Sequence, residues 1–480
     1  MGIRGHPAIF LAGIRPRGTV TQQDRCLKGQ IIRTFVYHSV IGPQEQNEAR
    51  VIADLRQQGV TIGGRERFAG KASMTELFHP HVTNVLGIMA LAIWLHLYFG
   101  RGWFWRVRKV DADRVADETL GEWPSVLAVV PARNEAQTIG RVVTGLVQQD
   151  YPGAFSVVVV DDHSEDGTAS IAQRVATENG TGVPVRVLNA SELPEGWTGK
   201  LWALNEGLSH GGVTQAGMSN GGGVRAAPEV AEFYWFTDAD VSHAPNTLGR
   251  LVERAERERL DLASLMVLLQ AKTLPERALI PAFLYFFLML YPPRWIADEE
   301  LATAGAAGGC LLLRGEALRR IGGFAAIRGE VIDDCALARA VKASGGRVWM
   351  GLTRKSVSLR SYGTFGEVRD LIARTAFTQL RYSVPMLAGT LLGMFLTYVA
   401  PVLLLFAHDS TAQALGFAAW LLMTLSFLPT VRFYWLSAVW APVLPLTAVF
   451  YAWATWLSAV RYWMGKGGLW KGRAQAPNGA

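Results

Sequence analysis

Long apolar stretches near both ends of this chain flank a middle part with a mixed pattern. Residues 82–99, VTNVLGIMALAIWLHLYF, carry one histidine and no formal charge over 18 positions. Three further uncharged stretches lie near the carboxyl end, at 384–407, 411–431 and 433–460. A helix of about 20 apolar residues spans the hydrocarbon core of a bilayer. The pattern therefore predicts one amino-terminal and about three carboxyl-terminal transmembrane helices, the latter within residues 384–460.

A shorter apolar run, ALIPAFLYFFLMLY, covers only 14 residues at 278–291. Because that length is short for a membrane crossing, we expect an interfacial helix at about 278–297 that lies on the membrane surface.

Charged residues beside the spans indicate an orientation. The segment GRGWFWRVRK directly follows the first span, and aromatics with basic residues mark the cytoplasmic side of a membrane. Three carboxyl-terminal crossings would place the basic tail, residues 461–480, outside the cell, whereas a re-entrant last stretch around APVLP would return it to the cytoplasm. The pattern leaves both arrangements open.

The middle of the chain, residues 122–383, has the pattern of a soluble α/β domain. SVLAVVPA and FSVVVVDD are continuous apolar runs, as in parallel strands that are covered on both faces. Each run is followed by a segment with apolar residues at helical spacing. Alternating strands and helices predict a doubly wound sheet, in which ligands bind at the carboxyl ends of the strands.

Composition agrees with membrane contact. Half of the 480 residues are hydrophobic, 16 are tryptophan, and the net charge is +7. An excess of basic residues suits cytoplasmic loops beside anionic lipids, and no basic stripe with exposed aromatics points to a nucleic-acid partner. Three cysteines without metal-ligand spacing predict neither a disulfide framework nor a zinc site. Residues 1–73 are rich in Gly, Arg and Gln, so we expect a poorly structured extension.

Polar clusters occur at four strand ends or loops of the middle domain. PARNE (131–135) and DDHSEDGT (161–168) follow the first two strands, TGKLWALNEG (198–207) is expected to precede a helix, and TDAD (237–240) ends the apolar run FYWFT. Because the ends of parallel strands meet at one edge of a sheet, these clusters are expected to line one crevice.

The residue types in this crevice suit a nucleoside diphosphate. Asp161 or Asp162 can accept a hydrogen bond from a base N–H, Glu135 can reach ribose hydroxyls, and Lys200 can meet a phosphate as a point charge.

Two carboxylates one residue apart repel each other unless a cation lies between them. Asp238 and Asp240 stand in this relation at the end of their strand. Carboxylate and phosphate oxygens are hard ligands, so the pair predicts a Mg²⁺ or Mn²⁺ site.

The ordered series PARNE, DDHSEDGT, TGKLWALN, TDAD and GEVIDDCALA resembles the family 2 glycosyltransferases, which have the GT-A fold, over about residues 122–383. With its membrane spans and the segment LPEGWTGKLWALN, the chain is most similar to the bacterial hopene-associated membrane glycosyltransferases. The resemblance implies that Asp238 and Asp240 form the metal-binding DxD pair. It places donor contacts at Pro131, Ala132, Glu135, Asp161, Asp162, Lys200 and Asp238.

The same resemblance implies a catalytic acidic pair at Asp333 and Asp334, with Asp334 as the general base and Asp333 where the family usually has Glu. Processive members have a Q-x-x-R-W motif. Here TQLRY keeps only the arginine, Arg381, as a further donor contact, which favours a single transfer over polymer synthesis.

The implied function is inverting transfer of a sugar from a nucleotide-sugar, expected to be a UDP-sugar, to a lipid acceptor, with hopanoid biosynthesis as a candidate pathway. The implied location is the bacterial inner membrane, as a multi-pass protein with a cytoplasmic catalytic domain. A catalytically silent membrane scaffold and a processive polysaccharide synthase are the alternatives. Each acidic cluster also has a structural reading as a helix cap.

Overall fold

The computed structural model describes residues 80–107, 120–210, 231–465, 469–470 and 473–474. The chain divides into two units, residues 1–71 and 72–480, and every described residue belongs to the second. The extension predicted at 1–73 and most of the basic tail predicted at 461–480 lie outside the described residues.

The middle of the chain forms an eight-stranded sheet with the order β3-β2-β1-β4-β7-β6-β8-β5. Its strands are β1 Val126–Ala132, β2 Phe155–Asp161, β3 Val185–Asn189, β4 Phe233–Thr237, β5 Val241–His243, β6 Leu262–Leu268, β7 Cys310–Arg314 and β8 Val348–Ser358. Strands β3, β2, β1 and β4 run parallel to one another, whereas β7 runs antiparallel to its neighbours β4 and β6. The predicted α/β class is confirmed, but the sheet is mixed rather than wholly parallel.

The two predicted apolar strands are buried along their whole length, because each separates two hydrophobic cores. All seven residues of β1 and all seven of β2 are buried. Side chains alternate between the faces of a strand, so Val129 packs in one core with Leu204, whereas Ala128 packs in the other with Ile139. A continuous apolar run is what such a two-sided environment requires.

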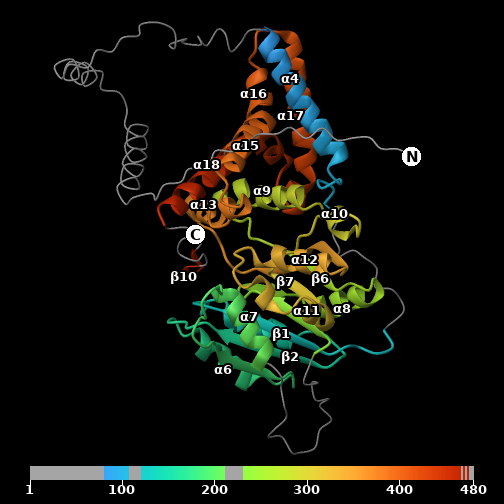
Figure 1. Ribbon diagram of the computed structural model, residues 1–480, viewed down its shortest axis with the longest axis vertical. Helices are drawn as coiled ribbons and strands as arrows, with labels where there is room; N and C mark the ends of the chain where they lie inside the picture. The colour runs from blue at the N-terminus through green and yellow to red at the C-terminus, as the bar shows by residue number, and fades with distance from the viewer. Residues whose placement is uncertain (1–79, 108–119, 211–230, 466–468, 471–472, 475–480) are drawn as a thin grey trace, which may run out of the picture. The chain divides into compact units, whose positions relative to one another are not determined.

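Helices cover both faces of this sheet (Figure 1). They are α5 Ile139–Val147, α6 Thr168–Glu178, α7 Gly199–His210, α8 Thr247–Arg257, α11 Gly315–Arg320, η3 Phe324–Ile327 and α12 Asp333–Ala343. The helices α13 Phe365–Ala373 and α14 Ala376–Gln379 instead pack against the apolar helices described below. A separate two-stranded ribbon joins β9 Leu469–Trp470 and β10 Arg473–Ala474.

Helix α7 differs from its sequence prediction and approaches the sheet unusually closely. The segment TGKLWALNEG does not precede a helix, because α7 already begins at Gly199. A Cβ atom at Gly207 would lie 2.4 Å from Cγ1 of Val129 on β1. Glycine is therefore required inside this helix, and the close packing brings Lys200 to the carboxyl end of β1.

Five helical segments among the described residues are long and apolar enough to cross a membrane. They are formed by α4 Pro80–Leu95 with η1 His96–Gly100, α9 Leu274–Leu290 with α10 Pro293–Ala297, α15 Val384–Met394 with η4 Phe395–Val399 and α16 Ala400–Leu404, α17 Ser410–Phe433, and η5 Ala438–Val443 with α18 Leu444–Trp463. The four stretches predicted as spans are thus helical.

The helix predicted to be interfacial is more enclosed than the first span. Half of the most apolar window of Leu274–Ala297 is buried inside the protein, against 22% for Pro80–Gly100. Hydroxyls of Thr447 and Tyr451 on α18 donate to main-chain carbonyls of α9 at Ala278 and Leu279, over 3.1 and 3.0 Å. In Figure 1, α9 runs across the ends of the apolar helices that are nearest the sheet. Helix α9 therefore joins the apolar helices to the α/β domain.

Arginine and tryptophan side chains gather where the apolar helices meet the α/β domain. The Arg101 guanidinium lies 4.6 Å from the ring centre of Trp295, and that of Arg354 lies 3.8 Å from the ring centre of Trp435. Such cation–π pairs keep a charge at the boundary between apolar and aqueous surroundings.

Candidate active site

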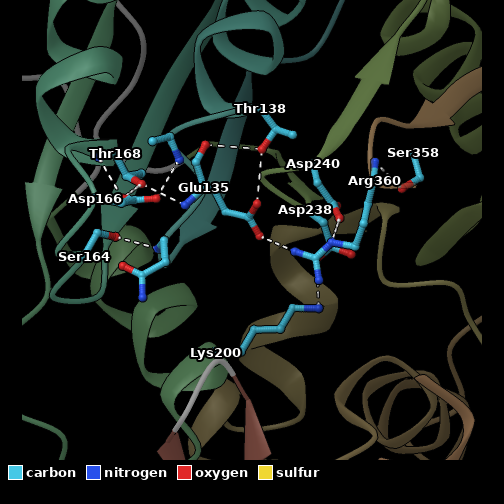
Figure 2. A network of polar contacts seen from close by, with 12 residues as sticks. Glu135, Thr138, Ser164, Asp166, Thr168, Lys200, Asp238, Asp240, Ser358 and Arg360 are labelled. Carbon is cyan, nitrogen blue, oxygen red and sulfur yellow. Dashed lines mark hydrogen bonds and ion pairs between the residues drawn. The ribbon is translucent and has the colours of Figure 1, made fainter. Parts of the chain in front are cut away.

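The ends of β1, β2 and β4 bring together the polar clusters found in the sequence. These strands are adjacent and parallel, so PARNE, DDHSEDGT and TDAD emerge at one edge of the sheet. Figure 2 shows residues of all three clusters beside Lys200 of α7. The clusters thus lie at one edge of the sheet, but the lining of the pocket described below includes residues of PARNE, TGKLWALNEG and TDAD and none of DDHSEDGT.

Lys200 forms the centre of this edge. Its Nζ lies 3.0 Å from Oδ1 of Asp238 and 3.2 Å from Oδ2 of Asp333. Burial works to lower the pKa of Lys200, but the nearby carboxylates of Asp238, Asp333 and Asp334 raise it above its ordinary value. The lysine is therefore charged throughout the physiological range and joins the DxD segment to the acidic pair.

Asp238 is only partly buried, with 37% of its side chain exposed, and it keeps its charge. Burial alone would raise its pKa, but Lys200 lowers it below the ordinary value. The charges of Arg374 and Arg360 act in the same direction.

Asp334 is held in one orientation by the main chain. Its Oδ2 accepts a hydrogen bond of 2.8 Å from the amide of Gly308, and its Oδ1 accepts one of 2.7 Å from the amide of Cys335. Burial raises the pKa of Asp334 to about 6, with a further contribution from Asp333. A carboxylate with such a pKa is deprotonated at neutral pH and is a stronger base than an ordinary aspartate.

Of the two acidic pairs, Asp333–Asp334 also serves the amino-terminal end of α12, where Asp334 accepts from the first-turn amide of Cys335, whereas the DxD pair caps no helix among the described residues. Asp333 and Asp334 lie inside the first turn of α12, whose N-cap is Ile332. Asp238 and Asp240 lie in the turn between β4 and β5, well before α8. In DDHSEDGT, the carboxylate that binds the first amide of α6 belongs to Asp166, at 3.1 Å.

Arg360, which the sequence analysis did not single out, pairs with two of the predicted site residues. Its Nη2 lies 2.8 Å from Oε1 of Glu135, and its Nε lies 3.2 Å from Oδ2 of Asp240. Figure 2 shows the guanidinium between the two carboxylates. Arg360 follows β8, which is linked to the DxD segment because Val241 of β5 pairs with Ser358.

Asp161 and Asp162 are buried at the end of β2, beside Ala132 of β1. Oδ2 of Asp161 accepts from the amide of Ser164 at 3.0 Å, whereas its buried Oδ1 has no hydrogen-bond partner within the described part of the chain. Arg133, also missed in the sequence, donates to the carbonyl of Asp162 and lies 3.5 Å from its Oδ2. An unsatisfied buried oxygen is an acceptor for an N–H group of a ligand.

A series of buried hydrogen bonds holds β4, the strand that precedes the DxD segment, in place. The Thr237 hydroxyl donates to the carbonyl of Gly309 at 3.1 Å and lies 2.7 Å from Nε2 of His243. Nδ1 of His243 lies 2.8 Å from the hydroxyl of Ser356 on β8. Burial lowers the pKa of His243 to about 3, so the ring is neutral. These hydrogen bonds therefore tie β4, β5, β7 and β8 together directly beside Asp238.

A pocket opens at this edge of the sheet. It contains about 340 Å³ of space that no atom fills, a volume that includes open solvent. Its lining combines charged residues of the site with apolar ones: Pro131, Lys200, Leu201, Leu204, Phe236, Thr237, Asp238, Gly308, Leu311, Phe324, Asp333, Asp334 and Leu337. The pocket thus offers both a charged surface and an apolar wall.

The site suits a divalent cation only in part. Within the described residues, no group of three or more His, Cys, Asp or Glu side chains is arranged to hold a metal ion. Asp238 and Asp240 supply carboxylate oxygens, which suit Mg²⁺ or Mn²⁺ when phosphate oxygens and water complete the coordination. The donor set therefore fits a cation that binds together with a diphosphate.

Arg381 does not join this cluster. It is exposed in the turn that follows α14, and the described residues that line the pocket do not include it. Arg374, at the end of α13, is the arginine of this region whose charge acts on Asp238. The sequence carried no signal for Arg374, because it lies outside every motif.

The fold and the site define an α/β domain with an acidic pocket, balanced by cations, at the carboxyl ends of its central strands. The family described as "Glycosyltransferase like family 2" matches residues 124–378, slightly more than half of the chain. The chain belongs to this family. The sequence prediction is thereby confirmed at the family level, and the match says nothing of the hopene-associated subgroup.

Individual relatives share shorter segments. A beta-monoglucosyldiacylglycerol synthase of Trichormus variabilis is 29% identical over 189 residues, which are 39% of this chain and 32% of the relative. A 4,4'-diaponeurosporenoate glycosyltransferase of Staphylococcus aureus is 31% identical over 87 residues, 18% of this chain and 20% of the relative. The chain thus spans about a third or less of the length of these curated relatives.

Among solved structures, the mannosyltransferase PcManGT from Pyrobaculum calidifontis in complex with GDP-Man and Mn²⁺ is similar. It is 21% identical, and the superposition covers 78% of this chain and 99% of that chain with a TM-score of 0.44.

Proposed function

We propose that this protein is a membrane-bound inverting glycosyltransferase that moves a sugar from a nucleotide-sugar to a lipid acceptor. The observation that carries the proposal is the meeting of Lys200, Asp238, Asp333 and Asp334 in one pocket. This pocket lies in a domain of a glycosyltransferase family, joined to apolar helices.

Asp334 is the general base of this reaction. Each carboxylate oxygen of Asp334 accepts one hydrogen bond from a main-chain amide. Each oxygen therefore keeps a second lone pair, which can take the proton of the substrate hydroxyl. The acceptor oxygen bonds to the anomeric carbon as the bond from that carbon to the diphosphate oxygen breaks. The proton of the acceptor hydroxyl passes to Asp334. Attack from the face opposite the leaving group inverts the anomeric configuration.

The donor is held by the remaining polar residues. The buried, unpartnered Oδ1 of Asp161 suits an N–H of the base, as in uracil. Glu135 suits the ribose hydroxyls, and Lys200 suits the diphosphate. Asp238 and Asp240 would hold Mg²⁺ or Mn²⁺, which when bound offsets the charge that develops on the leaving diphosphate.

Three observations support a lipid as the acceptor. The apolar helix α9 lies between the apolar bundle and the α/β domain (Figure 1), and the pocket has an apolar wall that includes Phe324 and Leu337. The name of the first relative, beta-monoglucosyldiacylglycerol synthase, describes a glycosylated lipid as its product. A hopanoid acceptor, a bacterial inner-membrane location and a cytoplasmic catalytic domain are part of the same proposal. The basic and aromatic residues at the helix–domain boundary support that orientation.

A transfer assay tests this function against its alternatives. Membranes that contain the full chain are incubated with Mn²⁺ and a radiolabelled donor, in turn UDP-glucose, UDP-N-acetylglucosamine and GDP-mannose. We expect label in solvent-extracted lipid with one UDP-sugar, and mass spectrometry of that lipid identifies the acceptor. Label in no fraction would favour the silent scaffold, and label in a long water-soluble polymer would favour the processive synthase.

The raised pKa of Asp334 predicts the pH dependence of the transfer. A general base acts only when deprotonated, so activity falls as the pH drops through its pKa, which is about 6. We expect kcat/KM to be level above that pH and to fall about tenfold for each pH unit below it. Initial rates between pH 4.5 and pH 8 at subsaturating donor measure the profile. A fall in kcat/KM that begins only near pH 4, the ordinary pKa of an aspartate, would contradict the conclusion that burial raises the pKa of Asp334.

A further inference from the structure

The carboxylates of the DxD segment are already paired with cations of the protein. Lys200 lies 3.0 Å from Oδ1 of Asp238, and Nε of Arg360 lies 3.2 Å from Oδ2 of Asp240. The second branch of the Arg360 guanidinium, Nη2, lies 2.8 Å from Glu135. Figure 2 shows the two ion-paired groups side by side, Arg360 with Glu135 and Asp240, and Lys200 with Asp238.

A metal ion at the same carboxylates would be a competitor of these side chains. Mg²⁺ and Mn²⁺ bind carboxylate oxygens at about 2.1 Å, closer than either cation of the protein approaches. Two like charges on one carboxylate in an enclosed site repel each other strongly. A metal ion that binds alone must therefore displace Arg360 from Asp240 and leave the guanidinium without that partner.

A diphosphate changes this balance, because it offers the displaced cations new partners. The planar guanidinium fork matches phosphate oxygens as well as it matches carboxylates. A metal ion that enters with a nucleoside diphosphate can take Asp240 while Arg360 moves to the phosphate.

The main chain around Arg360 suits such a move. The amide of Leu359 donates to the carbonyl of Asp240 at 2.7 Å, so the backbone beside Arg360 is fixed to the DxD turn. The side chain is 35% exposed and belongs to the segment between β8 and α13, outside both elements. The main chain of Arg360 is therefore anchored, while its guanidinium has space to reorient.

We propose that Arg360 is an internal counter-ion that occupies the metal position at Asp240 in the donor-free protein and passes to the diphosphate when metal and donor bind together. This inference rests on the proposed function, since it concerns the same donor site. This move of Arg360 couples the binding of the metal positively to the binding of the nucleotide. The coupling is reciprocal, because each ligand raises the affinity of the protein for the other by the same factor.

Mn²⁺ binding to the detergent-solubilised full chain tests the inference, with UDP as the nucleotide probe and the electron paramagnetic resonance signal of free Mn²⁺ as the readout. We expect UDP to tighten Mn²⁺ binding to the parent protein by about tenfold or more. In Arg360→Gln, Mn²⁺ alone should bind about tenfold more tightly than to the parent, and the effect of UDP should shrink correspondingly.

Arg320→Gln is the matched control. The side chain of Arg320 is 40% exposed and pairs at 2.8 Å with Asp261, whose side chain is 16% exposed. The pair of Arg360 with Glu135 is similar, with the same distance and exposed fractions of 35% and 14%. Asp261 lies at the opposite end of the sheet from the DxD segment, because its carbonyl accepts from the amide of Arg314, which pairs with Phe233 at the beginning of β4. The control should therefore bind Mn²⁺ as the parent does. Arg360→Lys keeps the charge and should restore weak binding of Mn²⁺ alone, which separates charge competition from distortion of the site.

Two results would overturn the inference. The first is equal Mn²⁺ affinity of the parent with and without UDP, which is decisive even if Arg360→Gln does not fold. The second is an Arg360→Gln protein that binds Mn²⁺ alone no more tightly than the parent. A failure to transfer sugar to any lipid, with the coupling intact, would count against the proposed function and leave the counter-ion role standing.

Discussion

Asp334→Asn is expected to lower kcat for sugar transfer by about 10²- to 10⁴-fold, the usual contribution of a general base. The amide cannot take the proton of the acceptor hydroxyl. Donor binding should persist, because Lys200 still pairs with Asp238 and Asp333. The measurement is label transferred from the nucleotide-sugar to lipid at saturating donor, together with UDP affinity of the same preparation.

The substitution also has a structural cost that the controls must separate. Asp334 accepts hydrogen bonds through both oxygens, and the NH₂ group of asparagine would face one of the two amides that now donate to it. Unchanged UDP affinity shows that the site remains formed. Glu330→Gln alters an exposed carboxylate shortly before α12 and should leave the rate within about twofold of the parent. Full activity of Asp334→Asn would remove Asp334 from the role of base.

The strands nearest the site were predicted well from sequence, because their burial is two-sided. Continuous apolar runs identify β1, β2 and β4 to within a residue. Since parallel strands end at the same edge, the meeting of PARNE, DDHSEDGT and TDAD follows from strand order alone. The proximity of Glu135 to the DxD segment belongs to this predictable part, whereas the arginine between them, Arg360, does not.

The beginning of α7 was predicted wrongly because glycine occurs both in loops before helices and inside helices that pack closely against a neighbour. The segment TGKLWALNEG was expected to precede a helix, and glycine inside a helical pattern ordinarily weakens the prediction of a helix. In the structure, Gly207 lies inside α7 because a side chain there would meet Val129 of the sheet. The need for glycine at this position comes from a strand that is distant in the sequence, so the residues around Gly207 do not reveal it.

Arg360 was missed for a related reason. Its place beside Asp240 depends on β5, a strand of only three residues, Val241–His243, that pairs antiparallel with the end of β8. A three-residue strand is too short to show a periodicity, and antiparallel pairing between distant segments cannot be derived from spacing. The cations of the site were therefore harder to predict than its carboxylates, which follow strands with clear patterns.

Asp240→Asn is expected to lower kcat/KM for the donor by about 10²-fold, as the loss of several kcal/mol of charge stabilisation at the leaving diphosphate implies. Asparagine keeps the shape of the side chain but removes the negative charge that attracts the cation. Arg360 would keep Glu135 as a partner at 2.8 Å, so the local fold should survive. Initial rates against Mn²⁺ concentration measure the loss, and Mn²⁺ binding in the presence of UDP should weaken in parallel.

The matched control is Asp261→Asn, which removes a carboxylate of similar burial that pairs with Arg320. Because Asp261 lies at the opposite end of the sheet, beside Arg314 and the beginning of β4, its loss should leave both the rate and its Mn²⁺ dependence unchanged. A parent-like Mn²⁺ response in Asp240→Asn would mean that the cation is held elsewhere. The ion pair of Asp240 with Arg360 would then be a structural link between the DxD turn and β8, and the metal would have to bind through Asp238 and the diphosphate without Asp240.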